Sequence, residues 1–189
     1  SFLAAGSDKG KFWIWDRQSQ QSQTYQGTHC NRIVDGGWNT KKQLALCSED
    51  HSISVNSVRG ETVARYEIDD VPCFPHFVKM DNQLALIFAS SSKPVVYVWE
   101  YNNGDKVTQI PFSKDLGKIV KCLTLNNGYI YVQFSSGRFA LAGFDGNIAV
   151  ERQVFPSTAS KADALQAKSL VCAGSSMKLV QMGDIGNIT

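Results

Sequence analysis

The feature that most constrains the fold of this sequence is an internal repeat with a period of about 42 residues. Segment 2–16 (FLAAGSDKGKFWIWD) aligns without a gap on segments 43–57, 129–143 and 169–183, and segment 83–100 aligns with a longer turn. The first apolar anchors of the copies are spaced by 41, 40, 46 and 40 residues and are Leu3, Leu44, Leu84, Ile130 and Leu170. Such a period predicts a stack of similar small units.

Each copy is predicted to be a β-hairpin. Apolar residues alternate in its second half, as at Phe12 and Ile14, and polar or Gly-containing turns such as SDKG, SEDH and SSG join the two halves. Further strand candidates lie at 32–38, 62–68, 76–80, 107–112, 119–125 and 148–155. Together with the hairpin, these candidates give four strands per repeat. Segment 159–168 has a helical composition, but its place in the repeat indicates a loop or a strand.

Four short antiparallel strands about every 42 residues are typical of an all-β fold, the WD40-type β-propeller. The dipeptides Trp15-Asp16 and Trp99-Glu100 close two hairpins where that family has its WD dipeptide, and His29 resembles the family's Gly-His element. The family's network of His, Ser or Thr, Asp and Trp is incomplete in every copy.

We therefore expect part of one propeller, about four blades of a ring that should have seven. The expected boundaries are a partial blade at 1–26, blades at 27–68, 69–112 and 113–155, and a partial blade at 156–189. The sequence has no initiator Met and no signal peptide, which indicates an internal part of a longer chain.

Composition excludes several classes of protein. A hydrophobic content of 43% suffices for a buried core, so a disordered chain is not expected. A formal net charge of +2 gives no basic surplus for nucleic-acid binding. The longest apolar run, at 84–89, is far shorter than the roughly 18 residues of a membrane span, so we expect no transmembrane segment.

The cysteines and the acidic turns suggest no cofactor. The five Cys residues form no CxxC or Cys/His spacing, so we expect small buried hydrophobes in a reducing compartment, not zinc ligands or disulfides. The group Glu49, Asp50 and His51 could bind a metal, but a polar hairpin tip is the simpler interpretation. Asp69-Asp70, before a Pro, indicates a solvated connection and a loop.

No catalytic, cofactor-binding or metal-binding residue is assigned. His29, His51 and His76 lie on three segments, and no nucleophile motif selects a triad among them. The Gly-rich stretches GSDKG and GDIGN lack the strand-to-helix context of a phosphate loop. Two further sets of residues do not indicate nucleic-acid contacts. The aromatic residues are expected to pack in the core, with Trp13 a candidate to face outward: Phe12, Trp13, Trp15, Trp99 and Phe139. The cations Lys9, Lys11, Lys41 and Lys42 are expected to be scattered surface charges.

Segment 38–63 (WNTKKQLALCSEDHSISVNSVRGETV) resembles a particular propeller family. That family is the N-terminal propeller of the large WD-repeat subunit of intraflagellar transport complex A, the WD repeat protein nineteen family. SFLAAGSDKG at the start, GKIVKC at 117–122 and QFSSGRF at 133–139 are also similar to it. Segment 156–168 departs from the family because it is shorter than the family's connection.

The resemblance implies a non-enzymatic scaffold that serves retrograde ciliary transport and the entry of membrane-protein cargo into cilia. The implied partners are sister subunits of complex A and cargo adaptors for ciliary membrane proteins. The implied locations are the cilium or flagellum, the ciliary base and the cytoplasm. The alternatives from the same fold are an interaction scaffold of a vesicle coat and a substrate receptor of a ubiquitin ligase, and an enzyme remains the rival of a different class.

Overall fold

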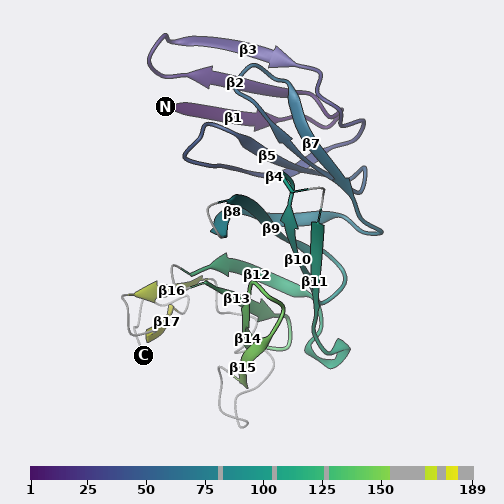
Figure 1. Cartoon of the computed structure of the whole chain (residues 1–189), viewed down its shortest axis with the longest axis vertical. Coiled ribbons are helices and arrows are strands. Elements are labelled where there is room, and N and C mark those ends of the chain that lie inside the picture. Colours follow the sequence, from purple (N-terminus) through teal and green to yellow (C-terminus); the bar gives the residue numbers. More distant parts are fainter. Residues whose placement is uncertain (81–82, 104–105, 126–127, 154–168, 174–177, 183–189) are drawn as a thin grey trace.

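The computed structural model describes residues 1–80, 83–103, 106–125, 128–153, 169–173 and 178–182, and its strands form a succession of small antiparallel sheets (Figure 1). We name these sheets blades 1 to 5 in chain order. Blade 1 has three strands, β1 (Phe2–Gly6), β2 (Phe12–Asp16) and β3 (Gln21–Tyr25). Blade 5 has two, β16 (Ser169–Ala173) and β17 (Lys178–Met182).

Blades 2, 3 and 4 each have four strands in chain order. Blade 2 comprises β4 (Ile33–Trp38), β5 (Leu44–Ser48), β6 (Ser52–Asn56) and β7 (Thr62–Glu67). Blade 3 comprises β8 (Pro72–Met80), β9 (Gln83–Ser90), β10 (Val95–Glu100) and β11 (Lys106–Pro111). Blade 4 comprises β12 (Ile119–Thr124), β13 (Tyr129–Phe134), β14 (Arg138–Gly143) and β15 (Ile148–Gln153), and a 3-10 turn (Lys114–Leu116) precedes it.

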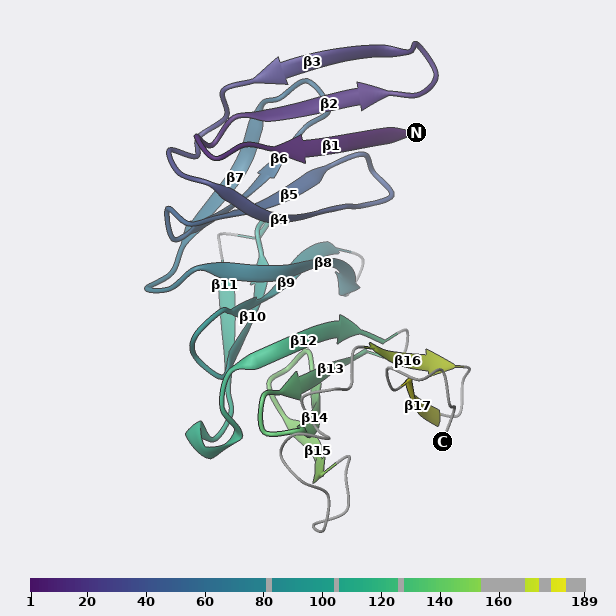
Figure 2. The ribbon, with the colours of Figure 1, turned by 180° about the vertical axis from the view of Figure 1, so that it is seen from behind.

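Blades 1 to 4 follow one another along the long axis of the molecule (Figures 1 and 2). The first strand of each four-stranded blade contacts the first strand of its neighbour, β4 against β8 and β8 against β12. The first strand of each four-stranded blade therefore forms the edge of its sheet near the neighbouring blades' first strands, and the fourth strand forms the opposite edge. The arrangement is part of a propeller ring, as the four-strand repeat predicts.

The hydrophobic core lies between the blades, because each sheet carries apolar side chains on both faces. Phe12 and Ile14 of blade 1 pack against Leu44 and Leu46 of blade 2. The other face of blade 2 packs on blade 3, and blade 3 packs on blade 4. These two interfaces consist of β-branched, aromatic and small side chains, among them Ile53, Val55, Phe88 and Trp99 between blades 2 and 3 and Val96, Val98, Ile130 and Val132 between blades 3 and 4. Strands buried on both faces explain the near-continuous apolar runs of the sequence.

Two local features recur in blades 2, 3 and 4: a register shift and a backbone hydrogen bond beside it. The register of the first strand shifts near its start, between Ile33 and Asp35 in β4 and at the matching points of β8 and β12. Next to this bulge, the backbone N–H of the hairpin turn donates to the carbonyl just before the first strand. Glu49 N lies 2.8 Å from Arg32 O, and Ser91 N lies 3.0 Å from Val71 O. Each blade therefore fastens its central hairpin to its incoming loop.

The strand positions follow the sequence expectations, with one clear correction. β8 begins at Pro72, whereas the pattern predicted a strand from His76 and a loop after Asp70. The two prolines and the bulge at Phe74, which has φ 56°, interrupt the alternation that marks a strand. Segment 159–168 lies outside the described residues.

Candidate interaction surface

Of the polar group singled out at the β5–β6 turn, Asp50 takes part in a buried network. The Asp50 carboxylate accepts hydrogen bonds from the Ser52 hydroxyl at 2.6 Å and from the Cys30 N–H at 3.0 Å, and its Oδ2 lies 3.0 Å from His29 Nδ1. His29 Nε2 lies 2.8 Å from Ser54 Oγ, to which Asn56 donates at 2.8 Å. The side chains of His29 and Asp50 are 1% and 4% exposed. Asp50 therefore lies in the hairpin turn, and from there it joins the incoming loop to the hairpin.

Hydrogen bonds keep Asp50 ionised. Burial by itself raises the pKa of the carboxyl, but the bonds from Ser52 and Cys30 and the adjacent His29 together lower it to about 2. Glu49 and His51 do not join the network among the contacts of the described residues, and His51 is exposed with φ 66°. The arrangement is a structural clamp.

A second carboxylate performs the same task in blade 3 from the opposite side. Asp70, in the incoming loop, accepts hydrogen bonds from the hydroxyls of Ser90 and Ser92 and, at 2.8 Å, from the Ser92 N–H. Burial raises the pKa of Asp70, but these bonds lower it well below the usual range. Asp69 is exposed and pairs with Lys93. Both residues lie in the connection before β8: Asp69 is exposed, as expected, whereas Asp70 is half-buried and bonded to the hairpin turn.

The three histidines are not brought together into a catalytic group. His29 belongs to the clamp of blade 2, whereas His76 Nε2 donates to the carbonyl of Cys122 in blade 4 at 3.0 Å. Within the described part of the chain, no three His, Cys, Asp or Glu side chains cluster in a way that could hold a metal ion. No helix of that part is long and apolar enough to cross a membrane.

The cysteines divide by position. Burial raises the pKa of the Cys47 and Cys122 thiols, and it raises the pKa of the half-buried Cys73 to about 12. These three thiols are therefore poor nucleophiles at neutral pH. Cys30 is exposed, which corrects the expectation that the cysteines are buried.

The aromatic residues lie mainly in the core. Phe12 and Trp99 are 1% and 0% exposed, and the Phe139 ring centroid lies 5.7 Å from that of Tyr131. Trp13 and Trp15 are both half-buried, so Trp13 does not differ from Trp15 by facing outward. The four lysines singled out with them are exposed, and Lys42 lies 5.6 Å from the Phe2 ring centroid.

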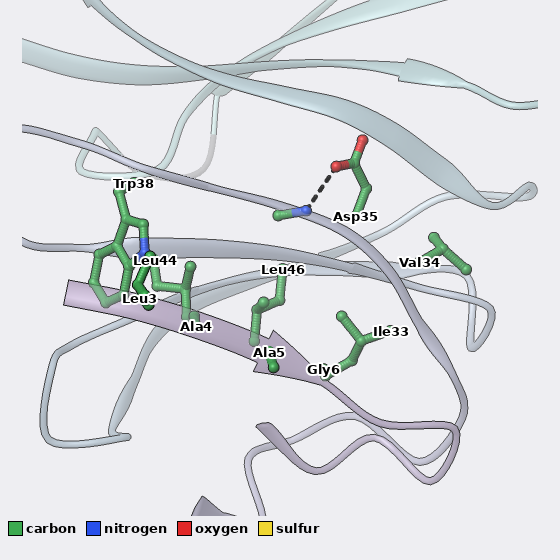
Figure 3. A pocket seen from close by; sticks show the side chains of 11 residues that line it. Leu3, Ala4, Ala5, Gly6, Ile33, Val34, Asp35, Trp38, Leu44 and Leu46 are labelled. Carbon is green, nitrogen blue, oxygen red and sulfur yellow. Dashed lines mark hydrogen bonds between the residues drawn. The ribbon is translucent and has the colours of Figure 1, made fainter. Parts of the chain in front are cut away.

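A groove lies between blades 1 and 2 (Figure 3). Its volume is about 330 Å³, and it is lined by β1, β4 and the start of β5. Among the described strands, β1 pairs only with β2, whereas the matching strands β5, β9 and β13 each pair on both sides. Leu3 and Val34, on the walls of the groove, are 59% and 41% exposed.

Blade architecture defines the class of the protein. Stacked four-stranded blades with buried interfaces and a clamp from loop to hairpin make this chain part of a WD40-type β-propeller. It belongs to the family described as WDR19 first beta-propeller, whose model matches residues 1–187.

Individual proteins support this family assignment. The chain is 31% identical over 147 residues to WD repeat-containing protein 19 of Homo sapiens, covering 75% of this chain and 11% of that protein. It is 20% identical over 139 residues to WD repeat-containing protein dyf-2 of Caenorhabditis elegans, covering 71% of this chain and 10% of that protein. The chain thus spans about a tenth of the length of these relatives.

Solved structures show the same fold at low identity. The computationally designed Ika8 protein has a TM-score of 0.74 at 12% identity, covering 99% of this chain and 54% of that one. The β-propeller domain of Cps50 (Swd1) from Myceliophteria thermophila has a TM-score of 0.71 at 12% identity, covering 96% of this chain and 60% of that one.

Proposed function

We propose that this chain is part of a non-enzymatic scaffold subunit of intraflagellar transport complex A. The observation that carries the proposal is the family match over residues 1–187. The scaffold would support retrograde ciliary transport and the entry of membrane-protein cargo into cilia. Its partners would be sister subunits of the complex and cargo adaptors, and it would act in the cilium and at its base.

The chemistry of the polar side chains supports a binding role. The carboxylates of Asp50, whose side chain is buried, and of the half-buried Asp70 are occupied by hydrogen bonds that hold loops to hairpins. The described histidine contacts are likewise made within or between blades. Side chains whose hydrogen bonds maintain the fold are poor candidates for general acid or base catalysis, since a catalytic group must reach substrate.

Affinity purification of the full-length protein from ciliated cells tests the proposal. We expect co-purification of the other complex A subunits at near-stoichiometric amounts, identified by mass spectrometry, and their absence from a mock purification with untagged protein. Recovery of coat or ubiquitin-ligase subunits without ciliary transport subunits would refute it. Turnover of a substrate that is lost on mutation of Glu49, Asp50 or His51 would refute the non-enzymatic part.

A further inference from the structure

The grooves between successive blades are built from equivalent positions, and the groove between blades 2 and 3 is closed. Gln43 precedes β5, and its Oε1 accepts hydrogen bonds from the Tyr101 hydroxyl at 2.9 Å and from Asn39 Nδ2 at 2.8 Å. Tyr101 follows β10 of blade 3 and is 7% exposed. Polar side chains from both blades therefore satisfy one another across this junction.

The same positions between blades 3 and 4 carry different side chains. Gln83 corresponds to Gln43, but its neighbours are Met80 in place of Asn39 and Phe144 in place of Tyr101. Neither replacement can donate a hydrogen bond. Gln83 is exposed, no hydrogen bond joins its amide to another residue of the described ranges, and a cavity of about 490 Å³ opens beside it.

The rim of this cavity carries more negative than positive charge. It is lined by Met80, Gln83, Glu100, Asn103, Lys106, Thr108, Phe144 and Asp145. Lys106 Nζ lies 2.9 Å from Glu100 Oε1, so these two charges pair with each other and the Asp145 carboxylate gives the rim its net negative charge. The hydrogen bond from Lys106 lowers the pKa of Glu100, and hydrogen bonds from Asn147 lower the pKa of Asp145. Both carboxylates are therefore ionised at neutral pH.

We propose that the groove between blades 3 and 4 binds an arginine side chain of a partner protein. Met80 and Phe144 would contact the methylene stem, and the guanidinium would donate to Asp145 and to the free Gln83 oxygen. The planar, multi-donor guanidinium suits such a site because it pairs with a carboxylate and packs on an aromatic ring. An anionic ligand is disfavoured because it would meet the Asp145 carboxylate and a lysine whose charge is already paired with Glu100. The inference does not depend on the assembly to which the protein belongs.

Saturation-transfer NMR on the full-length protein tests the proposal, with acetyl-Gly-Arg-Gly-amide as the probe. We expect saturation of the arginine β, γ and δ protons, with little for the uncharged citrulline peptide and none for acetyl-Gly-Glu-Gly-amide. Phe144→Tyr places a hydroxyl where Tyr101 has one, so it should close the groove onto Gln83 and reduce the signal at least fivefold. Asp145→Asn should reduce it several-fold.

A control separates the groove from other effects. Asp8→Asn removes an exposed carboxylate on the β1–β2 turn of blade 1 and should leave the arginine signal unchanged. A cooperative thermal melt for each variant would confirm that it is folded. Equal saturation of the citrulline or glutamate peptide, or an arginine signal that survives both groove variants, would overturn the proposal. Neither result would bear on membership of complex A.

Discussion

At the residue scale, a few buried polar side chains determine how each blade is held together. Asp50 accepts hydrogen bonds from Ser52 and Cys30 and pairs with His29, which comes from a segment 21 residues away. Because buried polar groups cost free energy unless they are paired, the members of such a network stabilise the fold only as a set. Asp70 repeats the device in blade 3 with serine partners.

The ionisation of Asp50 gives a prediction for stability against pH. Its pKa in the fold is about 2 against a usual value of 3.8, so its contribution is present above about pH 4 and is lost as the pH falls through 2. The size of this contribution is about 2 kcal/mol. We expect Asp50→Asn to lower the free energy of unfolding of the propeller by about this amount at pH 7, and the difference from wild type to shrink below pH 4.

Urea unfolding followed by tryptophan fluorescence at pH 7 and pH 3 measures this effect. Glu49→Gln, one residue away and outside the network, is the matched control and should change the free energy of unfolding by less than about 0.5 kcal/mol. A pH-independent loss in Asp50→Asn would show that the carboxylate's charge contributes nothing.

At the scale of the elements, the first strands of the blades approach one another closely enough to require glycine. β4 contains Gly36 and Gly37, and a Cβ added at Gly37 would lie 2.9 Å from the carbonyl oxygen of Pro75 in β8. That oxygen belongs to backbone, which cannot turn aside as a side chain can. The packing of β4 on β8 therefore depends on the absence of a side chain at this point.

Gly37→Ala should destabilise the propeller by about 1–3 kcal/mol, since overpacking forces two strands apart. The loss should appear as a lower midpoint in urea with an unchanged slope. Ser22→Ala, on the exposed strand β3, is the control and should be close to neutral. Equal midpoints for Gly37→Ala and wild type would mean that the junction of β4 and β8 can move without cost.

At the scale of the whole molecule, each sheet buries the apolar faces of its neighbours, and the first and last blades of the described series lack a neighbour on one side. In residues 1–189 taken alone, blades 2 and 3 are covered on both faces, whereas β1 pairs only with β2 among the described strands and Leu3 is 59% exposed. Free edges and apolar patches are the usual starting points of aggregation.

We expect residues 1–189, produced alone, to self-associate. Leu3→Lys places a charge on the free strand and should shift the chain toward the monomer in size-exclusion chromatography with light scattering. Lys11→Ala, on an exposed position of the same blade, should not reduce association. A monomeric wild-type chain with a sharp thermal transition would contradict the prediction.

The sequence by itself determined the repeat, the hairpins and the faces that the blades bury. Alternation at Phe12 and Ile14 predicts their burial because side chains of a strand point to opposite faces in turn, and the structure confirms it. The period of about 42 residues predicts the stacked blades for the same local reason: each unit repeats its own strand and turn pattern. The start of β8 could not be predicted in this way because its prolines and bulge break the alternation.

The tertiary structure alone decided which polar side chains meet. His29 and Asp50, or Tyr101 and Gln43, are far apart in the sequence and become neighbours only when blades fold and stack. The same holds for the two grooves, beside β1 and between blades 3 and 4, since a cavity depends on what the adjoining blade leaves unfilled. Periodicity records the burial of one strand at a time, whereas a site forms from side chains of several strands, and only the folded chain brings those together.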